Sequence, residues 1–228
     1  MKVMITAAVV LFASSQLFAQ KLGTFGSSVQ KKVGPKTVRV PYTSSTTYLG
    51  YAEPGSEDAI VDGKKFNYIY VWIPAVAPEI GVRMMSPVPP KIAAKLNNPG
   101  KSPNYDQNKD SQEYFDTYIT LEKSDIISIK GGITPERIAA ANWHKMAYND
   151  DNSEMPSQPS GKNYNSLMRV KSQTSDPLNS LTVGLYRIGF TTFKTGEVKG
   201  TFMAEVAAPV DMPGIIVSPN IEDLKHLD

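Results

Sequence analysis

Residues 181–206 read LTVGLYRIGFTTFKTGEVKGTFMAEV, and their pattern is typical of β-structure. In the second half of this stretch, small or apolar residues alternate with longer ones, as expected of a strand with one buried face. The first face holds Val198, Gly200, Phe202, Ala204 and Val206, and the second holds Lys199, Thr201, Met203 and Glu205. Residues 194–197 (KTGE) supply a turn, so the stretch predicts a half-buried antiparallel hairpin.

Three more stretches predict strands because β-branched and aromatic residues dominate them. They are residues 37–42 (TVRVPY), 66–74 (FNYIYVWIP, closed by Pro74) and 113–123 (EYFDTYITLEK). In the third, Phe115, Thr117, Ile119 and Leu121 alternate with Tyr114, Asp116, Tyr118 and Thr120.

Helical patterns are few and short. Residues 133–146 (ITPERIAAANWHKM) predict a helix capped by Thr134, with Pro135 at its first position and Glu136 at the positive end of its dipole. Residues 89–98 predict a shorter helix, residues 220–228 one or two marginal turns, and residues 86–111 a long surface loop. Many strands with few helices predict a mostly β protein, a single β-sandwich with helical insertions, and leave jelly-roll and immunoglobulin-like topologies both open.

The composition excludes several classes of function. The formal charge is only +2 in 228 residues, without blocks of like charge, so no nucleic-acid partner is expected. The absence of cysteine excludes disulfides, thiolate metal sites, a cysteine nucleophile and a lipid-modified cysteine. Lys2, the apolar run 3–12 and the small Ala19 predict a signal peptide over residues 1–19, leaving a mature domain of residues 20–228 without a transmembrane segment.

Catalytic and nucleotide-binding motifs are missing. The sequence has no Gly-x-Ser-x-Gly motif, and its two histidines, His144 and His226, are too far apart in sequence to suggest zinc. We expect His144 to lie near the end of the predicted helix in a capping or surface role. The chain is therefore not expected to be an enzyme.

Residues 149–154 (NDDNSE) hold three acids in six residues. Asn149, Asp151 and Ser153 alternate as in an EF-hand, but Glu154 stands where that loop needs Gly, and Ser160 where it needs Glu. From the residues alone this segment is either a solvated loop or one wall of a cation site.

Several stretches together resemble the major outer-membrane lipoprotein family of leptospires, from about Tyr48 to Val206. They are YLGYAEPG, VDGKKFNYIYVWIPAVAPEIGVRMMSP, YFDTYI, YNSLMRVK and GLYRIGFTTFKTGEVKGTFMAEV. The resemblance implies a jelly-roll β-sandwich with peripheral helices and an abundant surface protein without enzymatic activity. It also implies Ca²⁺ as a cofactor and extracellular-matrix proteins as partners.

The resemblance further implies a calcium site formed by Asp116, Thr117, Asp150, Asp151 and the Tyr164 carbonyl. The chain departs from the family in lacking the lipid-bearing cysteine, in a shorter aspartate run, and in lacking most of the C-terminal extension implicated in matrix binding.

The expected function is thus an exported, calcium-binding surface or periplasmic protein that binds macromolecular partners. It would reside in the periplasm, on the outer-membrane surface or outside the cell, without a lipid anchor. The alternative is a secreted hydrolase that uses aspartates as acid and base, drawn from Asp116, Glu122, Asp125, Asp150 and Asp151. Association as a homodimer through a sheet face or edge is a further prediction.

Overall fold

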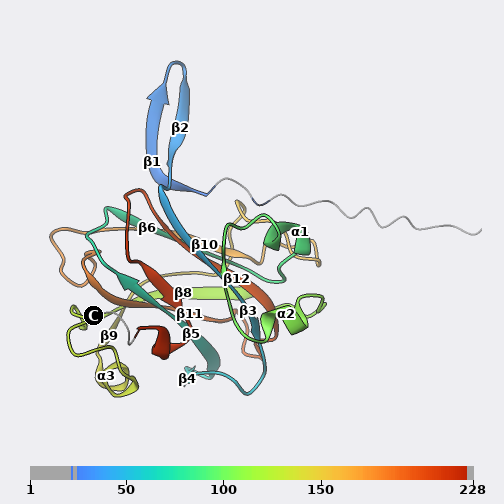
Figure 1. Ribbon diagram of the computed structural model, residues 1–228. Helices are drawn as coiled ribbons and strands as arrows, with labels where there is room; N and C mark the ends of the chain where they lie inside the picture. The colour runs from blue at the N-terminus through green and yellow to red at the C-terminus, as the bar shows by residue number, and fades with distance from the viewer. Residues whose placement is uncertain (1–21, 23–24, 225–228) are drawn as a thin grey trace, which may run out of the picture.

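The computed structural model describes residue 22 and residues 25–224, in which two sheets pack against each other (Figure 1). The first sheet has the strand order β10 (Ser166–Lys171), β6 (Glu79–Met85), β12 (Gly200–Ala208), β3 (Ser44–Ala52) and β7 (Gly100–Lys101). The second has the order β13 (Ile216–Ser218), β5 (Lys64–Ile73), β11 (Gly184–Thr192), β8 (Thr117–Ser124) and β9 (Trp143–Asn149), with β4 (Ala59–Val61) beside β5. All of these pairs are antiparallel except β3 with β7.

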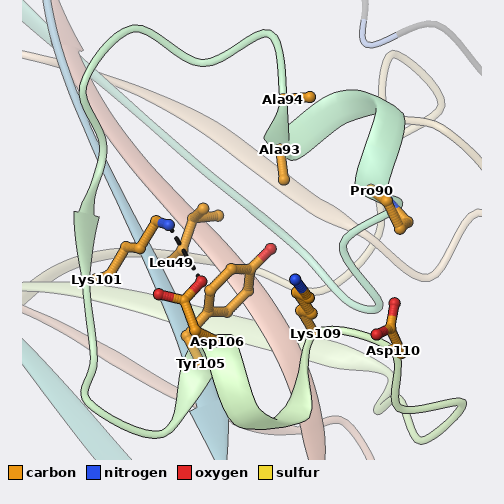
Figure 2. A pocket seen from close by; sticks show the side chains of 9 residues that line it. All are labelled: Leu49, Pro90, Ala93, Ala94, Lys101, Tyr105, Asp106, Lys109 and Asp110. Carbon is orange, nitrogen blue, oxygen red and sulfur yellow. Dashed lines mark hydrogen bonds and ion pairs between the residues drawn. The ribbon is translucent and has the colours of Figure 1, made fainter.

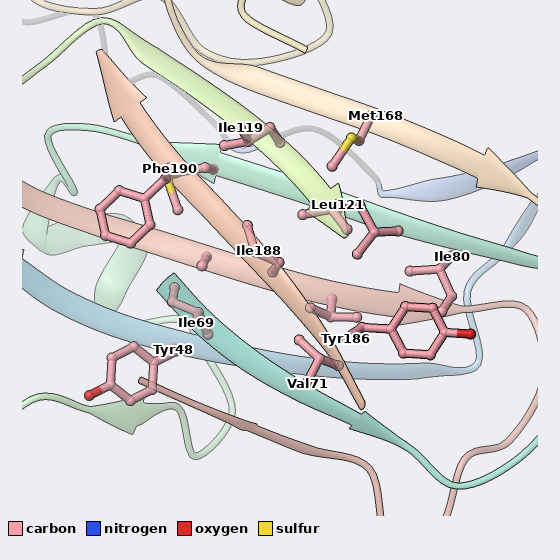
Figure 3. Close-up of a cluster of buried hydrophobic side chains, with 14 of the residues drawn as sticks. Tyr48, Ile69, Val71, Ile80, Ile119, Leu121, Met168, Tyr186, Ile188 and Phe190 are labelled. Atoms are coloured by element: carbon pink, nitrogen blue, oxygen red, sulfur yellow. The ribbon is translucent and has the colours of Figure 1, made fainter. Parts of the chain in front are cut away.

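The main core lies between the two sheets, which confirms the predicted β-sandwich (Figure 3). Ile119, Ile188 and Phe190 come from one sheet and Ile80 and Met168 from the other, and all five are buried. Residues two apart on a strand point to the same face of the sheet. The inward-facing side chains of the two sheets therefore meet in one apolar layer.

The outer face of each sheet is also largely covered. On one side, α1 (Pro90–Ala93) and α2 (Tyr105–Asn108) contribute Ile92 and Tyr105 to a second cluster with Leu49 and Met203. On the other side, α3 (Pro135–Ala140) and the 3₁₀ turn η1 (Ile221–Leu224) contribute Ile138 and Leu224. Burial on both faces explains why β5 reads as a nearly continuous apolar run.

The predicted hairpin of residues 181–206 is wrong. β11 lies between β5 and β8, while β12 lies between β3 and β6 in the opposite sheet, so neither strand has an edge free for the other. Phe190 and Phe202 instead face each other across the core, with ring centroids 4.7 Å apart. β12 is buried along its whole length, not on one face, because its second side is covered too. There Met203 packs with Ile92 and Tyr105, and Glu205 pairs with Arg83 at 2.6 Å.

The helix predicted over residues 133–146 is correct only at its beginning. Thr134 caps α3 by accepting a hydrogen bond from the Arg137 backbone N–H, but α3 ends at Ala140, and Trp143 already begins β9. His144 therefore lies on a strand rather than at a helix end. Tertiary packing outweighs helix propensity here, because the Trp143 ring lies 4.0 Å from the Arg187 guanidinium carbon on the outer face of the sheet.

The other predicted elements agree in place with the structure. The predicted strands correspond to β2 (Lys36–Pro41), β5 and β8, although β8 begins at Thr117, and the helix predicted over residues 89–98 is the single turn α1. The expected loop at residues 86–111 also contains α1, β7 and α2. The predicted signal peptide and His226 lie outside the described residues. In the part of the chain that is described, no helix is long and apolar enough to cross a membrane.

Candidate metal centre

Three of the predicted ligands lie at one end of the paired strands β8 and β9, where β8 begins and β9 ends. Asp116 immediately precedes β8, and Asp150 and Asp151 immediately follow β9. β8 and β9 are antiparallel, with Ile119 opposite Asn149, so the start of one strand lies beside the end of the other. The topology thus brings the acidic loop to Asp116.

The remaining two predicted ligands come from the same end of the sandwich. Thr117 is the first residue of β8, and its backbone N–H donates a 3.0 Å hydrogen bond to the Tyr164 carbonyl. Tyr164 lies two residues before Ser166, where β10 of the other sheet begins. All five predicted residues are therefore neighbours at one end of the molecule.

Asp116 lies in an environment that disfavours its negative charge. Burial raises the pKa of its carboxyl to about 6, and the nearby charges of Asp151 and Asp150 add to the rise. Its Oδ1 atom is buried and has no hydrogen-bond partner among the described residues. Burial and the Asp150 charge also raise the pKa of Asp151. Carboxylates that destabilise one another in this way would be stabilised by a cation.

Ser166 connects the ends of the strands. Its hydroxyl lies 2.7 Å from the Thr117 carbonyl, 2.9 Å from the Asp150 carbonyl and 2.7 Å from the Thr117 hydroxyl. The serine is fully buried, so these contacts hold the beginning of the acidic loop against β8.

Two buried amides complete this support. The Gln158 amide nitrogen lies 2.7 Å from the Phe115 carbonyl and 3.2 Å from the Tyr164 carbonyl. The Asn165 side-chain amide donates a 2.7 Å hydrogen bond to the Pro156 carbonyl, and the Asn165 backbone carbonyl accepts a hydrogen bond from the Asn152 backbone N–H in the acidic loop. Sequence reasoning missed Ser166, Gln158 and Asn165, since hydroxyls and amides form no distinctive spacing and only their position after the acidic loop sets them apart.

The site satisfies some requirements of a metal centre and not others. Among the described residues, no three histidine, cysteine or acidic side chains converge closely enough to hold a metal ion. The Tyr164 carbonyl already has three donors within hydrogen-bond distance, from Thr117 and Gln158. The oxygen of Asp116 without a partner and the nearby carboxylates of Asp150 and Asp151 are nevertheless of the chemical type that Ca²⁺ and Mg²⁺ prefer, although in this arrangement they do not converge on one point.

The other acids considered for hydrolysis have partners elsewhere. Glu122 accepts hydrogen bonds of 2.7 and 2.9 Å from Arg187, and one from Thr120. Asp125 accepts a 2.8 Å hydrogen bond from the Asn142 side chain. His144 lies 3.3 Å from the Asn179 side-chain oxygen. These contacts are those of structural residues, and none joins the group around Asp116.

The described part of the chain also has an open hollow of about 360 Å³ between α1 and α2 (Figure 2). Its polar lining is of mixed charge, and Lys101 and Asp106 pair at 3.1 Å. The full lining is Leu49, Pro90, Ala93, Ala94, Lys101, Tyr105, Asp106, Lys109 and Asp110. The lining contains no histidine, serine or threonine.

Comparison with known protein families gives a match over most of the chain. Residues 36–217 match the model of the LipL32 family, described as a surface lipoprotein of the Spirochaetales order. The chain belongs to the LipL32 family. This LipL32-family match includes every candidate ligand and begins at Lys36, the first residue of β2, so β1 (Gly26–Val33) lies outside it. The family description names a surface protein and no reaction, and the sequence has no cysteine to carry a lipid. No curated protein matches the chain.

Proposed function

We propose that this LipL32-family surface protein is a non-enzymatic calcium-binding protein, with its ion at the end of the sandwich where β8, β9 and β10 meet. The observation that supports the proposal most strongly is the buried Asp116 oxygen without a partner, beside two further aspartates. An isolated buried carboxylate is costly, whereas one that coordinates a divalent cation is not. Oxygen donors favour Ca²⁺ or Mg²⁺ over zinc.

The residues would divide the work as follows. Asp116 is held by the start of β8 and would supply a fixed carboxylate. Asp150 and Asp151 lie on the loop and would supply two further carboxylates, and the ion would relieve their mutual repulsion. Thr117 and Tyr164 would contribute oxygens only after exchanging part of their present hydrogen bonding. Ca²⁺ supplies positive charge and up to about eight coordination positions, most of which water would fill here.

Isothermal titration of the purified protein with CaCl₂ tests this proposal. We expect one site with a dissociation constant on the order of micromolar or weaker, because few carboxylates are available. At a hundredfold excess over Kd, calcium should stabilise the fold by about 2.7 kcal/mol and raise Tm accordingly. Asp116→Asn and Asp151→Asn should abolish both effects, whereas Asp211→Asn, at an exposed position, should change neither. Absence of heat and of a Tm shift at millimolar calcium would refute the proposal.

An aromatic cluster beside these carboxylates supports the binding of a macromolecular partner. The rings of Tyr118 and Tyr148 stack with centroids 5.8 Å apart, and the Lys64 ammonium lies 5.5 Å from the centroids of both Tyr118 and Phe193. Tyr148 and Phe193 are 65% and 47% exposed, so both rings present apolar surface to solvent beside Tyr118. Tyrosine is among the residue types that contribute most to binding at protein interfaces, so this cluster is the surface to which we assign the adhesion that the family resemblance implies.

The double variant Tyr148→Ser/Phe193→Ser tests this assignment on a panel of immobilised extracellular-matrix proteins. We expect wild-type binding to fall at least tenfold, since two exposed anchors are lost. Ile60→Ser/Leu178→Ser removes two exposed apolar side chains elsewhere and should bind like the wild type. Equal binding by all three proteins would exclude the cluster as the adhesive surface.

A further inference from the structure

The hairpin formed by β1 and β2 projects from the sandwich (Figure 1). It is a separate two-stranded sheet, and every residue from 29 to 39 is exposed. Its turn is tight: Gly34 has φ +61° and Pro35 follows it, which fits a two-residue connection with glycine at the first central position. Two-stranded hairpins without a covering layer are marginally stable in water.

The register of the hairpin gives it one mixed face and one polar face. Val33 pairs with Lys36 and Lys31 with Val38, and directly opposed residues share a face. Lys31, Val33, Lys36 and Val38 therefore form one surface, which we call the valine–lysine face. Val33 and Val38 are 58% and 43% exposed on it.

The second face is polar, and one of its side chains contacts the body of the protein. Lys32 pairs with Thr37, and Gln30 with Arg39, so these side chains lie opposite the valines. Arg39 reaches Glu154 of the acidic loop with an N–O distance of 2.9 Å. Because the polar face makes this contact, the valine–lysine face is directed away from it.

The charge of the hairpin is of one sign. Lys31, Lys32, Lys36 and Arg39 are all cationic, and no Asp or Glu precedes Glu53 in the sequence. Lys31 and Lys36 lie on the valine–lysine face, whereas Arg39 on the other face pairs with Glu154, so the two lysines of the valine–lysine face favour an anionic partner.

The base of the hairpin is firmly attached to the body. Glu79 is only 1% exposed and accepts hydrogen bonds of 2.8 Å from the Ser28 backbone N–H and from the Tyr42 hydroxyl. The Arg169 side chain donates a 2.7 Å hydrogen bond to the Gly26 carbonyl. The exposed half is therefore presented from a fixed base, as expected of a docking element rather than of a loose end.

We propose that the valine–lysine face of this hairpin docks on the surface of an anionic lipid bilayer. At such a surface, valines enter the boundary between headgroups and acyl chains, while the long lysine side chains extend to the phosphates. A soluble polyanion would neutralise the lysines and leave both valines in water. The alternation of the two residue types on one face is what favours lipid. The first strand of the hairpin lies outside the part of the chain that matches the family model.

Co-sedimentation with vesicles tests the proposal. The full chain should bind vesicles of phosphatidylcholine mixed with phosphatidylglycerol and not vesicles of phosphatidylcholine alone. Lys31→Gln/Lys36→Gln should weaken binding by a factor of about 25, from about fivefold for each lysine near a charged surface. Val33→Ser/Val38→Ser should weaken it about tenfold, since the valines leave their apolar environment. Binding should also fall at high salt, where the screening length shortens from about 10 Å to about 3 Å.

Lys130→Gln/Lys145→Gln is the matched control, because it removes the same charge at exposed positions distant from the hairpin in sequence. We expect it to bind like the wild type, and all variants to keep the wild-type Tm because every altered side chain is exposed. Three outcomes would overturn the proposal. They are equal binding of all variants, binding to soluble heparin but not to vesicles, and a wild-type dimer in sedimentation that Val33→Ser/Val38→Ser makes monomeric.

Discussion

At the scale of single residues, Asp116 is the most unusual group in the described part of the chain. Its carboxylate combines burial, two acidic neighbours and an oxygen without a hydrogen-bond partner. The raised pKa of Asp116 in the folded state means that the charged carboxylate lowers the free energy of unfolding. Above pH about 6 the charged carboxylate destabilises the calcium-free fold, and the effect is lost as pH falls toward the ordinary value of 3.8.

Replacing Asp116 by Asn should therefore stabilise the calcium-free protein at neutral pH. A shift of about two pKa units corresponds to roughly 3 kcal/mol if unscreened, and solvent screening of this partly exposed group reduces the expectation to about 1 kcal/mol. Urea unfolding in the presence of a chelator measures the change. Asp211→Asn serves as the control, and loss of stability in Asp116→Asn would show that the charge is already satisfied.

The affinity for calcium should depend on pH through the protonation of Asp116. Protons compete with the ion for Asp116, so Kd should be independent of pH well above 6 and should rise by about tenfold per unit below it. Calcium titrations in a series of buffers across that pKa measure the effect. A Kd that stays flat through this range would show that Asp116 is not a ligand.

At the scale of elements, local patterns predicted which segments form strands but not which strands pair. The alternation in residues 198–206 is real, yet β12 pairs with β3 and β6, partners far away in sequence that no local pattern specifies. Likewise, Thr134 and Pro135 correctly predicted where α3 begins. Its end at Ala140 depends on Trp143 packing against Arg187, a long-range contact.

In the candidate site, too, the sequence predicted some residues and not others. The acidic loop can be identified from composition, and Asp116, Thr117 and Tyr164 were placed with it only through the family resemblance. The supporting serine and amides could not be predicted, because their role follows from burial beside β8 and not from any spacing in the sequence.

The base of the hairpin offers a test at this scale. Glu79→Ala should leave the Ser28 backbone N–H and the Tyr42 hydroxyl without their acceptor and destabilise the protein by about 1–3 kcal/mol. Hydrogen exchange should accelerate selectively in β1 and β2. Glu53→Ala, at an exposed acid, should change neither quantity, and uniform acceleration throughout the chain would argue against a local role for Glu79.

At the scale of the whole molecule, the sandwich presents distinct surfaces around one core. The carboxylates and the aromatic cluster lie together where β8 and β9 meet, since the Asp150 charge contributes to the raised pKa of Tyr118 after burial and Tyr148. The hairpin extends away from the body (Figure 1). The proposed ion, partner and bilayer sites would therefore use different side chains.

Glu154 belongs to the acidic loop, and both of its carboxylate oxygens accept hydrogen bonds from arginines of the strands β2 and β10. Arg169 contacts it at 2.9 and 3.1 Å and Arg39 of the hairpin at 2.9 Å, and these guanidinium groups, Arg169 foremost, hold its pKa below the usual range. A ligand that fixes the acidic loop should therefore also favour the bound position of the hairpin. Because the coupling between two binding sites is reciprocal, each ligand must change the affinity for the other by the same factor. Because the pair with Arg39 is partly exposed, we expect that factor to be about two.

Calcium should accordingly tighten binding to anionic vesicles about twofold, and vesicles should tighten calcium binding by the same ratio at equal free calcium. Glu154→Gln should leave each binding event intact and make the two independent. If calcium and vesicles do not change each other's affinity for the wild type, the two binding sites are independent.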